Sequence, residues 1–430
     1  MRDQDLYAKL KNLVVRYFRY LYDSELPIVG TPPGNFVPKV KVDNNNSLSA
    51  DLKSRPDFGI RIFMTLSDFI KSPDNEDSIK DILRHDDIVR LLKDKGSAIK
   101  AKALMYNVLH PLIIRQFITQ DGIELNEAVF RSNYEAFEEY LIGKKDKYRL
   151  FALLDNFQMS SDEECVGPIK IRRLTSEENA AYNGDIADPA LQVRDPSLSI
   201  FEFMLEMEVV VARGSTPLTQ TNQNQFRWLI MLMKLLKSGS ICYNTIWCLP
   251  LSWSGMSFGG GSGPPRHSVI HKPYALESQD FVKLKGYWDK VEQYVGGSEP
   301  FWMIPLQRFC DAADRYRSDE ALIDYWIACE SLFGENVEMG ELTYRLSLRI
   351  AHFLEADPFK RKELRDIVKE AYRIRGHIMH RGAPDPKKLP SLTLEMERIT
   401  RNALCKCLEG QFESREEMIN RIECSILGIP

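Results

Sequence analysis

Residues 369–382 read KEAYRIRGHIMHRG, and this segment decides how the C-terminal part of the chain is interpreted. Read as a helix, it continues an apolar face made of Leu364, Val368, Ala371, Tyr372, Ile378 and Met379. Arg375 falls at the centre of this face, where a guanidinium is costly unless it is paired or lines a polar site. The helix is predicted to end just after His380, since Gly382 is a good C-cap and Pro384 cannot continue a helix.

Helical patterns surround this segment on both sides. The helix that contains it is expected over 358–381, and apolar residues recur at helical spacing in four further segments: 318–333, 341–354, 392–409 and 415–427. Short loops join these segments. The sequence therefore predicts a bundle of four to five helices over residues 301–430.

The chain before this bundle divides into two further regions. Residues 1–160 are predicted to be mostly helical, with helical patterns from about 60 to 155. A polar linker, SSDEE at 160–164, leads into residues 166–300, whose strand-like segments indicate a mixed α/β or β-rich domain with a sensor or regulatory role. We therefore expect a multidomain, mainly α protein.

Composition limits the class of protein and its location. The 430 residues carry a net charge of −4, with 44% hydrophobic and 27% charged residues, which is typical of a soluble globular protein. This charge argues against coating of a polyanion by the whole chain but allows a local basic groove. The eight cysteines include no CxxC pair, which favours reduced thiols over a zinc ribbon. The N-terminus has no signal-peptide pattern and no apolar run is long enough to span a bilayer, so we expect a cytoplasmic protein with no membrane partner.

One histidine lies beside two acidic residues, in the segment His85-Asp86-Asp87. These residue types bind metals, but the sequence shows no further ligand at a spacing typical of a metal site. We therefore expect neither a metal nor another cofactor.

Three segments resemble one family, the Apea-like HEPN domain. Residues 314–324 (DRYRSDEALID) with 327–333 (IACESLF) are similar to its first helix, and 342–351 (LTYRLSLRIA) to its second. The pattern Tyr-x2-Arg-x4-His-Arg-Gly at 372–382 is similar to its signature helix. The matches occur in the family's order and together cover roughly residues 308–410.

The resemblance implies a metal-independent endoribonuclease, of a kind often found in toxins and anti-phage defence. Two such domains pair, so that their Arg-x4–6-His motifs line one composite cleft. Carried over to this chain, Arg375 and His380 are the catalytic pair, Glu330 is the acidic residue of the first helix, and Tyr372 is the aromatic residue before the motif. Many active members have Asn, Asp, His or Ser directly after the arginine, where this chain has Gly376.

The resemblance also implies partners. RNA, whether tRNA or mRNA, is the expected substrate, and a second copy of the chain is the expected partner of the bundle. A phage-derived trigger or another regulatory partner would act through the first three hundred residues.

The chemistry of Arg375 and His380 agrees with this implication. RNA carries its own nucleophile, the 2′-hydroxyl, so cleavage needs no metal where groups for proton transfer and charge stabilisation are in place. An imidazole such as that of His380 can move a proton near neutral pH, and the end of a helix favours its cationic form. Arg375 is suited to hold a phosphate and to offset charge in the transition state.

Two alternatives stand beside this hypothesis. Arg375 could form an architectural ion pair with Glu330 or Asp324, and Glu330 and Tyr372 could serve packing alone. The whole bundle could be a non-catalytic dimerisation module, an RNA-binding scaffold or a sensor. The Arg–His spacing itself decides little, because the chain repeats it in Arg345-x6-His352 and Arg373-x6-His380.

Overall fold

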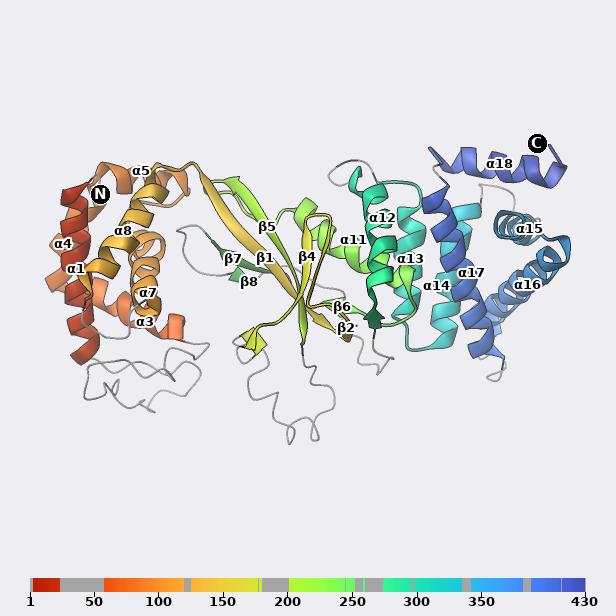
Figure 1. The fold of residues 1–430 in the computed structure, drawn as a ribbon, viewed down its shortest axis with the longest axis horizontal. Helices are drawn as coiled ribbons and strands as arrows, with labels where there is room; N and C mark the ends of the chain where they lie inside the picture. Colours follow the sequence, from red (N-terminus) through yellow and green to blue (C-terminus); the bar gives the residue numbers. More distant parts are fainter. Residues whose placement is uncertain are drawn as a thin grey trace, which may run out of the picture.

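The chain forms three parts that follow one another along the molecule, with helices at each end and an antiparallel sheet between them (Figure 1). The computed structural model describes residues 3–23, 58–119, 125–176, 178–179, 201–243, 245–251, 258–259, 274–294, 297, 299–334, 342–381, 388–410 and 412–429. The mainly helical fold with a central β region is the one that the sequence predicts. No helix among these residues is long and apolar enough to cross a membrane.

The N-terminal part packs its helices around a core of its own. Its elements are α1 (Gln4–Asp23), α3 (Phe58–Lys71), the 3-10 turn η1 (Pro73–Asn75), α4 (Glu76–Leu83), α5 (Asp86–Asp94), α6 (Ala101–Leu104), the π-helical turn η2 (Met105–Leu109), α7 (His110–Thr119) and α8 (Glu127–Ile142). Aromatic side chains fill the centre, among them the fully buried Tyr17, Phe130 and Tyr134. A bond of 2.6 Å between the hydroxyls of Tyr17 and Thr65 satisfies one of the few polar groups in this core.

The central sheet is antiparallel and has the strand order β3-β4-β5-β1-β7-β8, with β6 also paired to β1. The strands are β1 (Lys145–Asp155), β3 (Glu163–Val166), β4 (Ile169–Arg173), β5 (Phe203–Ala212), β6 (Cys242–Tyr243), β7 (Trp247–Pro250) and β8 (Phe258–Gly259). A separate parallel pair joins β2 (Phe157–Met159) to β9 (Tyr274–Leu276). In the long β1–β5 ladder, Leu150 pairs with Met207 and Ala152 with Leu205, and these side chains face α11 (Gln220–Leu236) within one core cluster.

The helical pattern predicted up to residue 155 is wrong for its last part. Helix α8 ends at Ile142, and β1 begins three residues later. The predicted linker at 160–164 is wrong as well, since β3 begins at Glu163 and pairs with β4. The helical interpretation fails because β1 buries Leu150 on one face and Phe151 on the other, which hides the alternation of a strand with one buried face.

The C-terminal helices follow the predicted pattern closely. They are α12 (Ser278–Glu292), α13 (Met303–Ala313), α14 (Ser318–Phe333), α15 (Leu342–Leu354), α16 (Pro358–Arg381), α17 (Leu389–Glu409) and α18 (Arg415–Leu427). The bounds predicted for the helices at 318–333, 358–381 and 415–427 are confirmed, and α17 begins three residues before the predicted start.

One cluster of buried apolar side chains runs from the inner face of the sheet through the C-terminal helices. A buried ion pair adds to this connection, with Nζ of Lys234 on α11 lying 2.5 Å from the carboxylate of Asp314, directly after α13. The division into domains at 1–160, 166–300 and 301–430 stays a prediction.

Candidate functional site

Helix α16 carries Arg375 and His380, and its first turn explains where it starts. Pro358 occupies the first helical position, where its missing N–H removes no helical hydrogen bond. Oδ1 of Asp357 accepts hydrogen bonds from the backbone N–H groups of Phe359 and Lys360, each at 2.9 Å. These bonds satisfy two donors that a helix start leaves unpaired. The sequence Asp357-Pro358 therefore fixes the start of the helix.

The buried face of α16 differs from the predicted one. Its fully buried members are Val368 and Ala371, and Leu364 and Ile374 are nearly as buried. Met379, predicted to lie on this face, is 60% exposed. Since successive helical residues are about 100° apart, Ile374 takes the inward position and Arg375 lies at the border of the face, not at its centre.

Arg375 at this border is only partly paired. Its Nη2 lies 3.8 Å from Oε2 of Glu330 on α14, which is an ion-pair distance but too long for a hydrogen bond. The Nε atom is buried and has no hydrogen-bond partner among the described residues. The side chain as a whole is 28% exposed. Arg375 therefore presents donors at a partly open site, with Glu330 close enough to orient it.

Tyr372 and Asp324 have clearer surroundings. The Tyr372 ring packs on Trp326 of α14, with ring centroids 5.2 Å apart and planes inclined by 53°. Trp326 is fully buried, so it holds Tyr372 in place one turn before Arg375. Asp324 binds Nε of Arg315 at 2.8 Å and lies 3.8 Å from Arg308. The architectural partner of Arg375 is accordingly Glu330, and Asp324 belongs to a different ion-pair group.

His380 lies in the last turn of α16, as the sequence predicts, but its side chain falls outside the described residues. The predicted cap residues Gly382 and Pro384 also fall outside them. Gly376 is described, and a Cβ added to it would meet no atom within 4 Å. The position after Arg375 therefore has room for a side chain.

The two competing Arg–His spacings have structural partners. Arg373 holds the carboxylate of Glu370 with bonds of 2.7 and 2.8 Å on the surface of α16. On α15, Arg345 and Arg349 both bind Glu423 of α18, and the hydrogen bond from Arg349 lowers the pKa of Glu423. Arg345 and Arg373 thus each have a carboxylate within hydrogen-bond distance, whereas the ion pair of Arg375 with Glu330 is 3.8 Å long.

A pocket of about 670 Å³ lies beside the first half of α16. Its lining includes Leu364 and Ile367 of α16 with Arg398 and Lys406 of α17. Arg375 does not line it.

Sequence reasoning missed one further group, in the N-terminal part. Asp3 lies next to His85 and Asp87, so the structure supplies the third residue that the sequence pattern lacked. The only local signal for Asp3 is its position before the amphipathic helix α1, which indicates a helix cap and not a ligand.

Comparison of the chain with protein-family models, with curated proteins and with solved structures finds no match in any of the three.

Proposed function

We propose that the chain is a metal-independent HEPN-type endoribonuclease that cleaves RNA by attack of the 2′-hydroxyl. The observation that carries this proposal is Arg375. It is a partly buried guanidinium with incomplete pairing, on helix α16, which contains residues 372–381 of the segment that resembles the family's signature. Its neighbours Tyr372 and Glu330 are the two residues that the resemblance assigns to supporting positions.

The weak pairing of Arg375 suits a phosphate-binding role. A guanidinium that already held a carboxylate in two short hydrogen bonds, as Arg373 does, would have to break them before binding a phosphate. At 3.8 Å, Glu330 can orient Arg375 while its N–H groups remain available to an anion. The buried Nε has no hydrogen-bond partner among the residues that the structure describes, which leaves a desolvation cost of about 1–3 kcal/mol that a bound phosphate oxygen could offset.

The charge of α16 also supports RNA as the ligand. The helix carries eight arginine and lysine residues against three acidic residues, in a chain whose net charge is −4. A basic helix of this kind attracts the phosphate backbone irrespective of base sequence. Substrate choice between tRNA and mRNA would then depend on the fold of the RNA.

The arrangement of the pair supports action as a dimer. Five residues of helix correspond to a rotation of about 140°, so Arg375 and His380 do not share one narrow face. In a dimer, Arg375 of one copy and His380 of the other copy can line the same cleft, so that a composite site uses both side chains. Two apolar side chains on α16 are exposed and available for a contact between the two copies: Phe359 is 81% exposed and Met379 is 60% exposed. We propose that the dimer acts in the cytoplasm in anti-phage defence or as a toxin, under the control of a phage-derived trigger or another regulatory partner.

Cleavage of total RNA and of isolated tRNA by purified protein tests the proposal. Arg375→Ala and His380→Ala should each abolish cleavage. The matched variant Arg373→Ala, which loses exposed contacts with Glu370 and His377, should cleave like wild type. Products should end in a 2′,3′-cyclic phosphate, and EDTA should leave cleavage intact. Unimpaired cleavage by both Arg375→Ala and His380→Ala would refute the assignment.

The second candidate is a non-catalytic RNA-binding or dimerisation scaffold. Gly376 favours it, because this position lacks the polar side chain of many active members of the family. On this alternative, wild type binds RNA in a gel-shift assay and forms dimers without producing cleavage at any protein concentration. Arg375→Ala then weakens RNA binding only, which separates the two candidates.

A further inference from the structure

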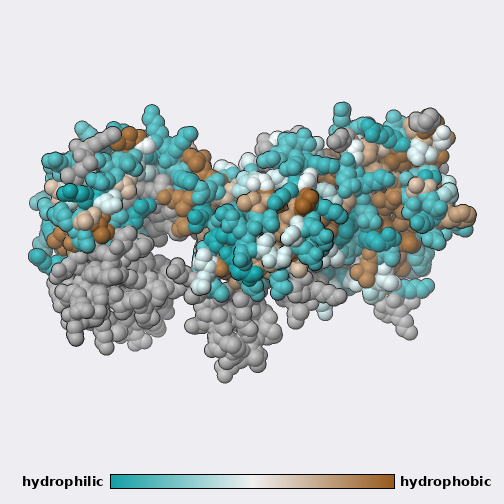
Figure 2. All heavy atoms as spheres, in the orientation of Figure 1, coloured by the Kyte–Doolittle hydropathy of each residue, from teal (hydrophilic) through white to brown (hydrophobic). Residues whose placement is uncertain are grey.

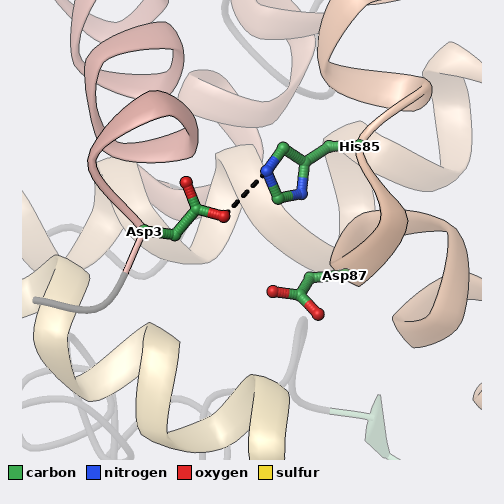
Figure 3. A group of neighbouring side chains, drawn as sticks. All are labelled: Asp3, His85 and Asp87. Carbon is green, nitrogen blue, oxygen red and sulfur yellow. Dashed lines mark ion pairs between the residues drawn. The ribbon is translucent and has the colours of Figure 1, made fainter.

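A histidine and two aspartates from separate segments meet at the edge of the N-terminal helices. Asp3 lies immediately before α1, His85 immediately before α5, and Asp87 in the first turn of α5. One ligand atom from each residue can be chosen so that all three lie within 4.8 Å of one another. Figure 3 shows the carboxylate of Asp3 facing the imidazole ring of His85, with the carboxylate of Asp87 beside the same ring.

Asp3 is held firmly in this position. Its Oδ1 accepts a hydrogen bond of 2.9 Å from the backbone N–H of Leu6, which caps α1. Its own N–H donates to Glu138 at 2.7 Å, and its carbonyl accepts from the hydroxyl of Tyr134 at 3.0 Å. Three bonds thus fix the backbone and one carboxylate oxygen, and the other oxygen, Oδ2, points at Nε2 of His85 at 2.8 Å. Preorganisation of this kind is what a binding site needs.

The other two members of the group, His85 and Asp87, keep capacity for a ligand. Nδ1 of His85 is buried and has no hydrogen-bond partner among the described residues. Asp87 receives one bond of 2.6 Å from Arg90, at Oδ1, and a carboxylate has a second oxygen to offer an ion. Both side chains are therefore oriented, and neither has its full set of partners.

The surroundings are negative and open to solvent. A surface pocket of about 510 Å³ includes the three residues, and its lining holds four aspartates against one lysine and one arginine. An ion can reach the site through this opening, and the excess of carboxylates favours a cation.

We propose that Asp3, His85 and Asp87 bind a divalent transition-metal ion of the zinc class, which fastens the start of α1 to the turn between α4 and α5. One imidazole nitrogen with two carboxylate oxygens is a donor set for zinc, manganese or iron, and is less suited to magnesium or calcium, which prefer oxygen alone. An ion with bonds of about 2.0–2.2 Å holds tetrahedral ligand atoms about 3.3–3.6 Å apart. The chosen ligand atoms lie within 4.8 Å of one another, so the widest pair would close by about an ångström. Oδ2 of Asp3 and Nε2 of His85, now 2.8 Å apart, would separate by about half an ångström if both bind the ion, and water would complete the coordination.

This inference departs from the sequence-based expectation of no metal and does not rest on the proposed function. The site lies in the N-terminal helices, whereas the nuclease proposal concerns α16 in the C-terminal helices (Figure 1). Loss of the metal would loosen the N-terminal helices without removing a group from the cleavage chemistry.

Metal titration of the full chain, after treatment with a chelator and its removal, tests the inference. Isothermal titration with Zn²⁺ should show one saturable equivalent, Mn²⁺ should compete, and Mg²⁺ should not. Zn²⁺ should also raise the melting temperature, because binding to the folded state alone stabilises it. His85→Gln and Asp87→Asn should each weaken Zn²⁺ binding more than about tenfold, since even the loss of an outer-shell partner weakens metal sites by about ten- to a hundredfold.

Asp86→Asn is the matched control, because Asp86 lines the same pocket but lies outside the three-residue group. It should bind Zn²⁺ like wild type. The inference is overturned if wild type shows no saturable equivalent, or if His85→Gln and Asp87→Asn bind as tightly as wild type. The second result would assign the zinc to other groups, such as the eight free thiols. Circular dichroism of each variant establishes that it is folded before titration.

Discussion

Helix α16 and the group formed by Asp3, His85 and Asp87 bring side chains together in different ways. On α16 the candidate residues lie within three turns of one helix, so their relative positions can be predicted from their spacing in the sequence. In the N-terminal group, Asp3 meets His85 and Asp87 only after the chain has folded. Local spacing identifies sites on one element, whereas sites between elements require the tertiary structure.

The two regions also differ in what holds them in place. A buried apolar face packs α16 against its neighbours, with Trp326 of α14 under Tyr372. The N-terminal group is held by a helix cap, hydrogen bonds and an ion pair at a solvent-exposed edge. Truncation of a buried side chain that packs against α16 should therefore lower the free energy of unfolding more than truncation of a residue in the N-terminal group.

The largest expected effect is that of Trp326→Ala. Trp326 is fully buried, and truncation of a buried tryptophan lowers the free energy of unfolding by about 3–5 kcal/mol. Equilibrium unfolding in urea measures the loss. Phe359→Ala, which removes an aromatic side chain that is mostly exposed on α16, is the control and should change stability by about 0.5 kcal/mol or less. A loss below about 1 kcal/mol for Trp326→Ala would show that α16 does not depend on this packing.

Asp3→Ala should have a smaller effect. It removes the cap of α1 and the ion pair with His85, which together contribute about 1–2 kcal/mol. Asp5→Ala is the matched control, because Asp5 lies in the same turn and pairs with Lys9 at the surface. Thermal unfolding of the metal-free variants compares the two. Equal losses for Asp3→Ala and Asp5→Ala would mean that the position of Asp3 has no special importance.

Local patterns allowed much of the C-terminal fold to be predicted. The start of α14 at Ser318 and the extent of α16 and α18 follow from apolar spacing and from residues such as Pro358. The candidate Arg375 was found in the same way, as a charged residue beside apolar ones. The spacing did not reveal that Ile374 takes the inward position, because packing against the neighbouring helices sets the rotation of α16.

Where burial or partners come from distant segments, the sequence was a poor guide. Strand β1 buries Leu150 and Phe151 on opposite faces, so its pattern resembles a buried helix as much as a strand. Nothing in the sequence around Asp3 indicates that the folded chain places it beside His85. For β1 and for Asp3 alike, the local sequence does not show which distant segment packs against the residue.

Gly376→Ala should stabilise α16 by about 0.5–1 kcal/mol. Alanine restricts the unfolded chain more than glycine does, and its Cβ would meet no atom within 4 Å. Gly167→Ala is a control of opposite sign, because Gly167 has φ of 56° and a Cβ there would lie 1.9 Å from Nε1 of Trp288. Urea unfolding measures both variants. A destabilised Gly376→Ala would indicate that α16 needs a flexible position after Arg375.

The smallest expected effect concerns pH and His352 on α15, next to α16. Burial, assisted by the charge of Arg361 on α16, lowers the pKa of His352 from its ordinary value of 6.5. The unfolded chain therefore takes up a proton at this position at a higher pH than the folded chain does. Above the ordinary pKa both states are neutral and His352 contributes nothing; as pH falls below it, the folded state loses stability. Melting temperatures at pH 7.5 and pH 5 should accordingly differ less for His352→Gln than for wild type, and an equal difference would contradict the assignment.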